Sequence, residues 1–174
     1  MDYKYLIILI ISIILISACS QKQIQKEADN MRLTSPAFQE GQFIPSRFTC
    51  DEEDVSPHLI ISEVPKNAKS LALIMDDPDA PMGTFVHWVV WNIPPEKQEI
   101  LENEDLPNQG TTDFKRQGYG GPCPPSGTHR YFFKLFALDI VLDLKDGSAK
   151  KDLENAMKGH IIDTAQLLGL YKRS

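Results

Sequence analysis

Two places in this sequence share one construction: a loop stiffened by proline and opened by glycine leads into a strand of β-branched and aromatic residues. The loop at residues 76–81 precedes the apolar run 85–93, and the loop at residues 118–127 precedes the run 131–138. Residues of this composition favour strands, and the loops between them carry polar groups on a rigid support. The chain is therefore expected to form a sheet that holds a polar pocket at its edge.

The remaining pattern is that of a β-rich domain with long loops. Twelve prolines and ten glycines, mostly between apolar runs, mark the turns. Strands are expected at residues 71–75, 85–93 and 131–138, with shorter ones at 33–35 and 59–62.

The segments outside these strands are assigned by their periodicity. Residues 103–115 are polar and aperiodic, so a loop is expected there. Residues 150–157 predict a helix with its N-terminal cap near Ser148. Residues 161–170 fit either a helix or a returning strand, and their own pattern favours a helix.

The first eighteen residues have the features of a lipoprotein signal peptide. Lys4 precedes an apolar run at residues 6–16, which is short for a membrane span of about 20 residues. The run ends at Ile-Ser-Ala-Cys, and this resembles a lipobox in which Cys19 receives the lipid. An uncleaved anchor helix is the alternative. Residues 19–31 are polar and predict a flexible tether, and residues 32–174 form the domain. The protein is thus expected to be exported and held on the extracytoplasmic side of a membrane by Cys19.

Two further cysteines and the net charge bear on the compartment and the partners. Cys50 and Cys123 form an even pair in a compartment that permits disulfides. A bridge between them would close a loop of about 74 residues and stabilise the fold by about 4 kcal/mol at most; two free thiols are the alternative. The formal charge of −6, without a basic cluster, argues against nucleic acid as a partner. The pairs Lys150-Lys151 and Lys172-Arg173 are interpreted as solvated faces.

The first motif offers carboxylates and an imidazole. Asp77 and Asp79 flank Pro78, whose fixed φ sets their directions. Strand alternation predicts that His87 and Trp88 point to opposite faces. A buried, structural histidine is the alternative to a binding one.

The second motif offers backbone amides and a polar pair of side chains. Gly120 and Gly121 permit close approach and can present N–H groups to an anion. His129 and Tyr131 share a strand face, which makes them the pocket pair. Arg130 lies on the opposite face and is expected to form an ion pair with a carboxylate.

With both motifs in view, the chain resembles the phosphatidylethanolamine-binding protein family, in its bacterial Raf-kinase-inhibitor-like branch. The resemblance covers the whole domain, and it rests on both motifs and on residues 35–38, 45–50, 54–57 and 153–173. It implies a mostly β fold in which a large antiparallel sheet packs on a smaller one, with one or two short helices near the C-terminus. It also implies that residues 159–171 return as a strand, against the pattern of that segment alone.

The resemblance further implies a small anion pocket and its residues. By position these are Asp77, Asp79, Pro81, His87, Gly121, Pro122, His129 and Tyr131. The family also implies a cis Ala80–Pro81 bond. The sequence departs from the branch at residues 51–53 and at His58, both on the loop beside the pocket.

Three function classes follow from these features. The first is a binding protein for a small anion or phospholipid headgroup, without a cofactor, whose binding strengthens as the pH falls toward 6 because a protonated histidine offsets the carboxylates. The second is an inhibitor of a protease or signalling protein that acts through a protein interface. The third is a thiol enzyme that uses Cys123 with His129 or His87. No hydrolase motif or zinc-type spacing appears, and a metal site built from Asp77, Asp79, His87 and His129 stays open.

Overall fold

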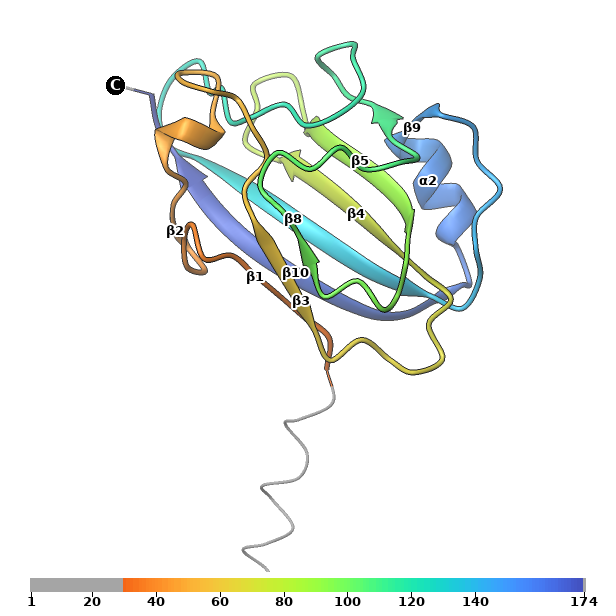
Figure 1. Ribbon diagram of the computed structural model, residues 1–174. Coiled ribbons are helices and arrows are strands. Elements are labelled where there is room, and N and C mark those ends of the chain that lie inside the picture. Colours follow the sequence, from red (N-terminus) through yellow and green to blue (C-terminus); the bar gives the residue numbers. More distant parts are fainter. Residues whose placement is uncertain (1–29, 174) are drawn as a thin grey trace, which may run out of the picture.

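The computed structural model describes residues 30–173 (Figure 1). The predicted signal peptide, Cys19 and the tether up to residue 29 lie outside the described residues. Met31 is 3% exposed and packs in the core, and its backbone N–H donates to Asp163 at 2.9 Å. Met31, at the end of the predicted tether, is therefore held against the domain by packing and by this hydrogen bond. No helix within residues 30–173 has the length and apolar character that crossing a membrane requires.

The main sheet has five strands in the order β2, β10, β8, β4, β5 (Figure 1). Their bounds are Gln42–Phe43, Ile161–Tyr171, His129–Leu138, Ser70–Asp77 and Phe85–Ile93. Neighbouring strands are antiparallel, except that the short β2 lies parallel to the end of β10. The end of β4 and the start of β5 therefore both lie near the start of β8.

The smaller elements cover the two faces of this sheet. A second sheet contains β1 (Arg32–Thr34), β3 (Leu59–Ser62) and β6 (Glu99–Ile100). A third pairs β7 (Gly110–Thr111) with β9 (Gly147–Ala149). Helix α2 (Lys150–Met157) follows β9, and a 3-10 helix, η1 (Ser46–Phe48), follows β2. This confirms the predicted mostly β fold with a larger and a smaller sheet.

Strand β4 shows how the two faces are buried. Leu71, Leu73 and Met75 belong to the core between the main sheet and the small sheet. Ala72 and Ile74 belong to the core beneath α2, which contributes Leu153 and Met157. Because both faces are covered, β4 is an almost continuous apolar run rather than an alternating one.

The C-terminal segment differs from its own sequence pattern. Residues 161–171 form strand β10, which pairs with β8 along its whole length. The helix favoured by the pattern is wrong, and the strand implied by the family resemblance is confirmed. Pairing with β8 supplies an inter-strand ladder that outweighs local propensity. The predicted loop at residues 103–115 likewise contains the short strand β7.

Helix α2 has the predicted bounds but a different N-terminal contact. The Asp152 carboxylate accepts the backbone N–H of Ala149 at 3.0 Å, whereas the Ser148 hydroxyl donates to the carbonyl of Lys145 at 2.7 Å. Lys150 is not simply solvated as predicted, because its ammonium lies 2.5 Å from the buried carboxylate of Asp76. This ion pair joins α2 to the main sheet.

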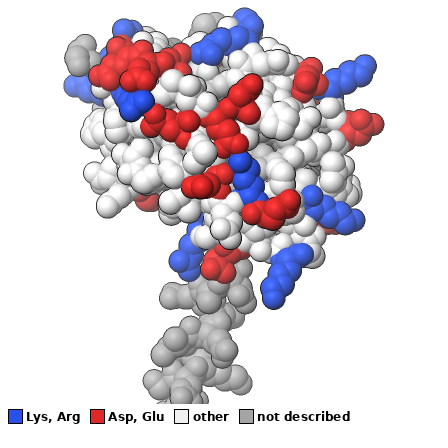
Figure 2. Space-filling model, in the orientation of Figure 1, with Lys and Arg blue, Asp and Glu red and all other residues white. Residues whose placement is uncertain are grey.

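Charged side chains are unevenly placed on the face drawn in Figure 2. Acidic side chains gather at the upper left, while basic side chains are scattered and form no continuous patch on this face. Arg47 of η1 lies among carboxylates, 2.6 Å from Glu102 and 3.2 Å from Glu53. This part of the surface therefore offers no broad basic area.

The two tryptophans provide a matched test of core polarity. Trp88 and Trp91 are both fully buried, but only the Trp88 indole N–H has an acceptor, the Gln109 amide oxygen at 2.8 Å. We expect Trp88→Phe to lower the free energy of unfolding by about 1–2 kcal/mol more than Trp91→Phe, because it also leaves the Gln109 amide oxygen without its donor. Chemical denaturation of both variants measures this difference, and equal losses would contradict it.

Candidate ligand-binding site

A cavity of about 640 Å³ opens at the end of the main sheet where β4 ends and β5 begins. Of the site residues named from the sequence, Asp77, Pro81 and His87 line it, together with Phe85 and Phe114. The other predicted residues lie around it rather than in its wall: Asp79, Gly121, Pro122, His129 and Tyr131. The loops of both sequence motifs thus meet at one place, although they contribute unequally to the surface of the cavity.

A β-bulge in β5 determines where His87 points. Met75 pairs with Trp88, but the next residue, Asp76, pairs with Val86, so β5 carries one extra residue here. Trp88 and Tyr131 lie in the same core, and the His87 ring is 5.2 Å from the Tyr131 ring. His87 and Trp88 therefore face the same side of the sheet, and the predicted alternation is wrong at this point.

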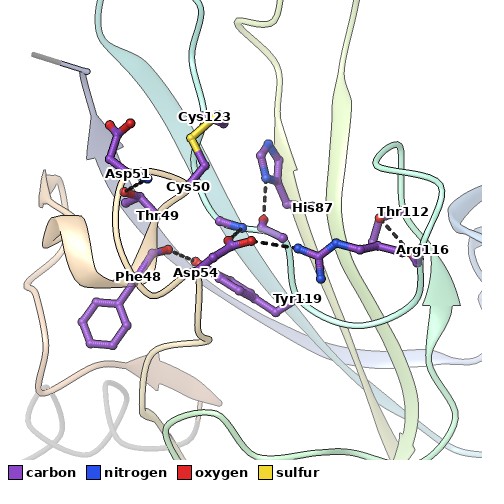
Figure 3. Close-up of polar contacts among 12 residues, drawn as sticks. Phe48, Thr49, Cys50, Asp51, Asp54, His87, Thr112, Arg116, Tyr119 and Cys123 are labelled. Carbon is purple, nitrogen blue, oxygen red and sulfur yellow. Dashed lines mark hydrogen bonds and ion pairs between the residues drawn. A yellow bond between two sulfur atoms is a disulfide. The ribbon is translucent and has the colours of Figure 1, made fainter.

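The His87 ring is held from one side and packed by aromatic rings. Its Nδ1 lies 2.7 Å from the Gly120 carbonyl oxygen, and the Gly120 N–H donates to the His87 carbonyl at 3.0 Å (Figure 3). The rings of Phe85 and Phe114 lie 5.1 and 5.3 Å away. This clasp fixes the ring, and Figure 3 shows the second ring nitrogen pointing away from Gly120.

Burial makes His87 a neutral imidazole. It lowers the pKa of His87 below 6.5, and the bond to Gly120 and the charge of Asp77 only partly offset this effect. Because Nδ1 donates its proton to the Gly120 carbonyl, Nε2 carries a lone pair. Within residues 30–173 no group donates to that atom, so His87 offers an acceptor to the cavity.

The lowered pKa of His87 predicts a pH dependence of stability. Below pH 6.5 the unfolded chain binds a proton at His87 more readily than the folded chain, so stability falls as the pH decreases through that value. In His87→Asn the amide can still donate to Gly120, but the titrating group is gone. We therefore expect the parent to lose more stability than this variant between pH 7.5 and 5.5 in urea unfolding. A constant difference between the two proteins would contradict the assignment.

Asp77 and His129 form a buried pair beside the cavity. The Asp77 carboxylate lies 2.7 Å from Nδ1 of His129, and both side chains are less than 10% exposed. The other Asp77 oxygen accepts the backbone N–H of Asp79 at 2.8 Å. Asp77 thus orients the His129 ring. Nε2 is the ring nitrogen of His129 that Asp77 does not engage.

Asp79 is bonded to Arg130 and not to a histidine. Arg130 binds it with two side-chain bonds of 2.6 and 2.9 Å, and the Arg130 backbone N–H adds a third at 3.0 Å. This confirms the predicted ion pair of Arg130, whose hydrogen bond lowers the pKa of Asp79 to about 2. Because Asp79 points to Arg130, the four residues of the open metal site do not converge. Among residues 30–173 no three carboxylate, imidazole or thiol groups are placed to hold a metal ion.

The glycine amides of the second motif are already bonded within the protein. Gly120 donates to His87, and Gly121 donates to the Asp54 carboxylate at 2.6 Å (Figure 3). The expectation that both amides face an anion is therefore wrong. Glycine is required at 121 for another reason, because a Cβ there would lie 2.5 Å from the Phe48 carbonyl oxygen.

Asp54 is a site residue that the sequence reasoning missed. Its carboxylate joins Gly121 to Arg116, whose guanidinium lies 2.9 Å away, and its backbone has a φ of 56° (Figure 3). An aspartate that ties two loops together looks like any surface acid in the sequence. Its place in residues 54–57, one of the segments on which the family resemblance rests, is the signal that could have indicated it.

A disulfide joins the two loops that carry Cys50 and Cys123 (Figure 3). The Cα atoms lie 5.4 Å apart, and the Cys50 N–H donates to the Pro122 carbonyl at 3.2 Å. Cys123 and the two prolines after it line the cavity, so the bridge supports part of its wall. The thiol that a nucleophilic mechanism would require is occupied by this bond.

The loop at residues 80–84 forms the rim of the cavity. The Ala80–Pro81 bond is trans, in contrast to the cis bond that the family implies, as are all peptide bonds in the described part of the chain. The turn instead closes through Gly83, which has a φ of 102° and donates to the Ala80 carbonyl at 3.1 Å. It leaves Met82 fully exposed at the mouth.

The residues that depart from the family pattern are engaged elsewhere. His58 Nε2 lies 2.9 Å from Glu99, and Glu52 accepts the Ser46 hydroxyl at 2.5 Å. Neither side chain lines the cavity.

Tyr131 carries a buried hydroxyl without a hydrogen bond in the described structure. Burial raises its pKa, and the nearby charge of Asp77 adds to this effect. The hydroxyl lies near Asp77 and the Cys123 backbone, which both line the cavity, but it makes no well-formed bond to either. An unpaired buried hydroxyl is costly unless another group supplies its partner.

Comparisons with known proteins extend over most of the chain. A family model described as phosphatidylethanolamine-binding protein matches residues 34–172. A UPF0098 protein of Methanothermobacter thermautotrophicus is 53% identical over 150 residues, covering 82% of this chain and 99% of the relative. A UPF0098 protein of Aquifex aeolicus is 51% identical, covering 82% and 89%.

Two solved structures share the fold. The homologue CT736 of Chlamydia trachomatis superposes with a TM-score of 0.82 at 42% identity, covering 84% of this chain and all of that one. YbcL of E. coli, described as a member of the mammalian PEBP family, superposes with a TM-score of 0.78 at 29% identity, covering 83% and 99%.

Proposed function

The chain belongs to the phosphatidylethanolamine-binding protein family, and on this premise we propose that its cavity binds a small anion, above all a phosphorylated group such as a phospholipid headgroup. The observation that carries the proposal is a pair of polar atoms without a partner among residues 30–173, one in the cavity wall and one buried just behind it. They are Nε2 of His87, which has a lone pair, and the unpaired hydroxyl of Tyr131.

These two atoms suit a monoprotonated phosphate. Its P–OH group can donate to Nε2 of His87, while another of its oxygens accepts from the Tyr131 hydroxyl. The Asp77 carboxylate would repel a dianion, but it is engaged with His129 and with the Asp79 N–H. The complex then holds one proton between the phosphate and His87. Binding is therefore stronger near pH 6 than at pH 8, because the second pKa of a phosphate monoester is about 6.

The cavity has room for more than a phosphate. Sites of about 300–1,000 Å³ hold molecules of drug size, and this one measures about 640 Å³. Its outer wall is apolar and includes Phe85, Phe114 and Pro124. A phosphate at the inner end, with an organic substituent toward the mouth, uses both parts. With the lipidated Cys19 that the sequence predicts, the binding would take place at the extracytoplasmic surface of a membrane.

A tyrosine pair tests this proposal. In Tyr131→Phe we expect the affinity for inorganic phosphate and phosphoethanolamine to fall about tenfold or more, since a hydrogen bond to a charged group is lost. The stability of the free protein should not fall, because the hydroxyl has no partner there. Isothermal titration at pH 6 and urea unfolding measure the two quantities.

The matched control is Tyr119→Phe. Tyr119 is also buried, but its hydroxyl already donates to the Phe48 carbonyl at 2.7 Å, whereas the Tyr131 hydroxyl has no partner. This variant should lose about 1–2 kcal/mol of stability and keep its phosphate affinity. Unchanged phosphate binding in Tyr131→Phe would count against the site.

An inhibitor of another protein is the second candidate. It is favoured by Met82, a large apolar side chain that stands fully exposed on the rim. Absence of any binding of phosphate, phosphoethanolamine or acetate to the parent would favour this function over the first.

A further inference from the structure

The outer part of the cavity is bounded by a rigid turn at residues 112–116. The Thr112 N–H donates to the Arg116 carbonyl at 2.9 Å, and the Lys115 N–H donates to the Thr112 carbonyl at 3.0 Å. Asp113 fixes the turn to β5, because its N–H donates to the Val86 carbonyl at 3.0 Å and its carboxylate accepts the Val86 N–H at 2.8 Å. Three consecutive side chains of this turn, at 113, 114 and 115, line the cavity.

Lys115 occupies a costly backbone position in this turn. Its φ of 63° lies in the left-handed region, which a residue with a Cβ adopts less favourably than the right-handed form. Its side chain is 83% exposed, so packing does not account for a lysine here. Strain of this kind in a cavity wall is a reason to look for a function.

The charges at the mouth are opposite and only loosely joined. Lys115 is the one basic residue in the cavity wall, and its ammonium lies 4.0 Å from Asp113, beyond hydrogen-bond distance. The other acidic residue of the wall, Asp77, is buried and bonded to His129. Asp113 and Lys115 are therefore the two charges that a bound molecule meets outside the inner site.

We propose that Asp113 and Lys115 discriminate among phosphorylated ligands by the charge of the substituent that reaches the mouth. The inference rests on the proposed function, in which the phosphate occupies the inner end near His87 and Tyr131. Asp113 then attracts a substituent that carries an ammonium, and Lys115 attracts one that carries a carboxylate. The rigid turn holds both groups in place before the ligand arrives, so little ordering is needed on binding.

Two small probes of similar size and opposite charge test this inference. Phosphoethanolamine ends in an ammonium and phosphoglycolate in a carboxylate, and the readout is the ratio of their Kd values. Lys115→Met should shift the ratio in favour of phosphoethanolamine by about two- to fivefold, the range of an exposed ion pair. Asp113→Asn retains an acceptor for Val86 and should shift the ratio by a similar factor toward phosphoglycolate. Lys115→Arg should keep the parent ratio, and 1 M KCl should shrink both shifts.

Structural damage cannot move one ratio in opposite directions in two variants, so opposite shifts support the inference. A ratio that stays within 1.5-fold in both variants, or moves the same way in both, overturns it. Inorganic phosphate separates this failure from failure of the proposed function. If phosphate binds the parent and His87→Asn weakens it, an unresponsive ratio refutes only the role of Asp113 and Lys115. If phosphate does not bind the parent, both proposals fail.

Discussion

Replacing Asp77 with alanine is expected to lower the free energy of unfolding by about 3–5 kcal/mol, because two buried donors lose their charged acceptor. The loss is large because Asp77 is 3% exposed and satisfies two donors, Nδ1 of His129 and the N–H of Asp79. Both donors would be left without an acceptor where little water reaches them. Guanidinium unfolding at pH 7 measures the effect.

The neighbouring aspartate is the control for this prediction. Asp79 has more contacts, three bonds to Arg130, but the Arg130 side chain is 52% exposed. We expect Asp79→Ala to cost no more than about 1 kcal/mol, because water replaces the lost contacts. Equal losses at the two positions would show that burial does not set the strength of these pairs. A double-mutant cycle with His129→Ala isolates the Asp77–His129 coupling.

Replacing both Cys50 and Cys123 with serine is expected to lower the free energy of unfolding by about 2–4 kcal/mol. The bridge joins positions 73 residues apart, so its removal releases a long loop in the unfolded chain. Guanidinium unfolding of the double variant measures the loss, and the parent unfolded in dithiothreitol should match it. A loss below about 1 kcal/mol in both experiments would show that the loops are held by their other contacts, such as the Cys50–Pro122 hydrogen bond.

The strands and α2 could be predicted because their patterns are local. The runs at β3, β5 and α2 carry enough β-branched or helix-forming residues that composition alone gives their bounds. Strand β10 could not be predicted in this way. Its own residues favour a helix, and the ladder with β8 that makes it a strand joins residues far apart in the sequence.

The sequence could predict where the site lies, but not how its side chains and amides are oriented. Both motifs converge on the cavity because each precedes a strand, β5 or β8, that begins at the same end of the main sheet. The bulge that turns His87 toward Tyr131 leaves no mark in the sequence, since it is defined by pairing with β4. The use of the Gly121 amide by Asp54 was equally invisible, because the two residues are 67 positions apart.

The contact of Met31 with Asp163 and the cavity lie near opposite ends of the main sheet. Asp163 pairs with Ala137 near one end of β8, whereas the cavity lies beside His129 at the other end, roughly 26 Å away at 3.3 Å per residue (Figure 1). A membrane that holds the chain through a lipid on Cys19, as the sequence predicts, would therefore lie near the Asp163 end, and the cavity would open away from it. A phospholipid of that same membrane could then enter the cavity only after the domain had rotated on its tether.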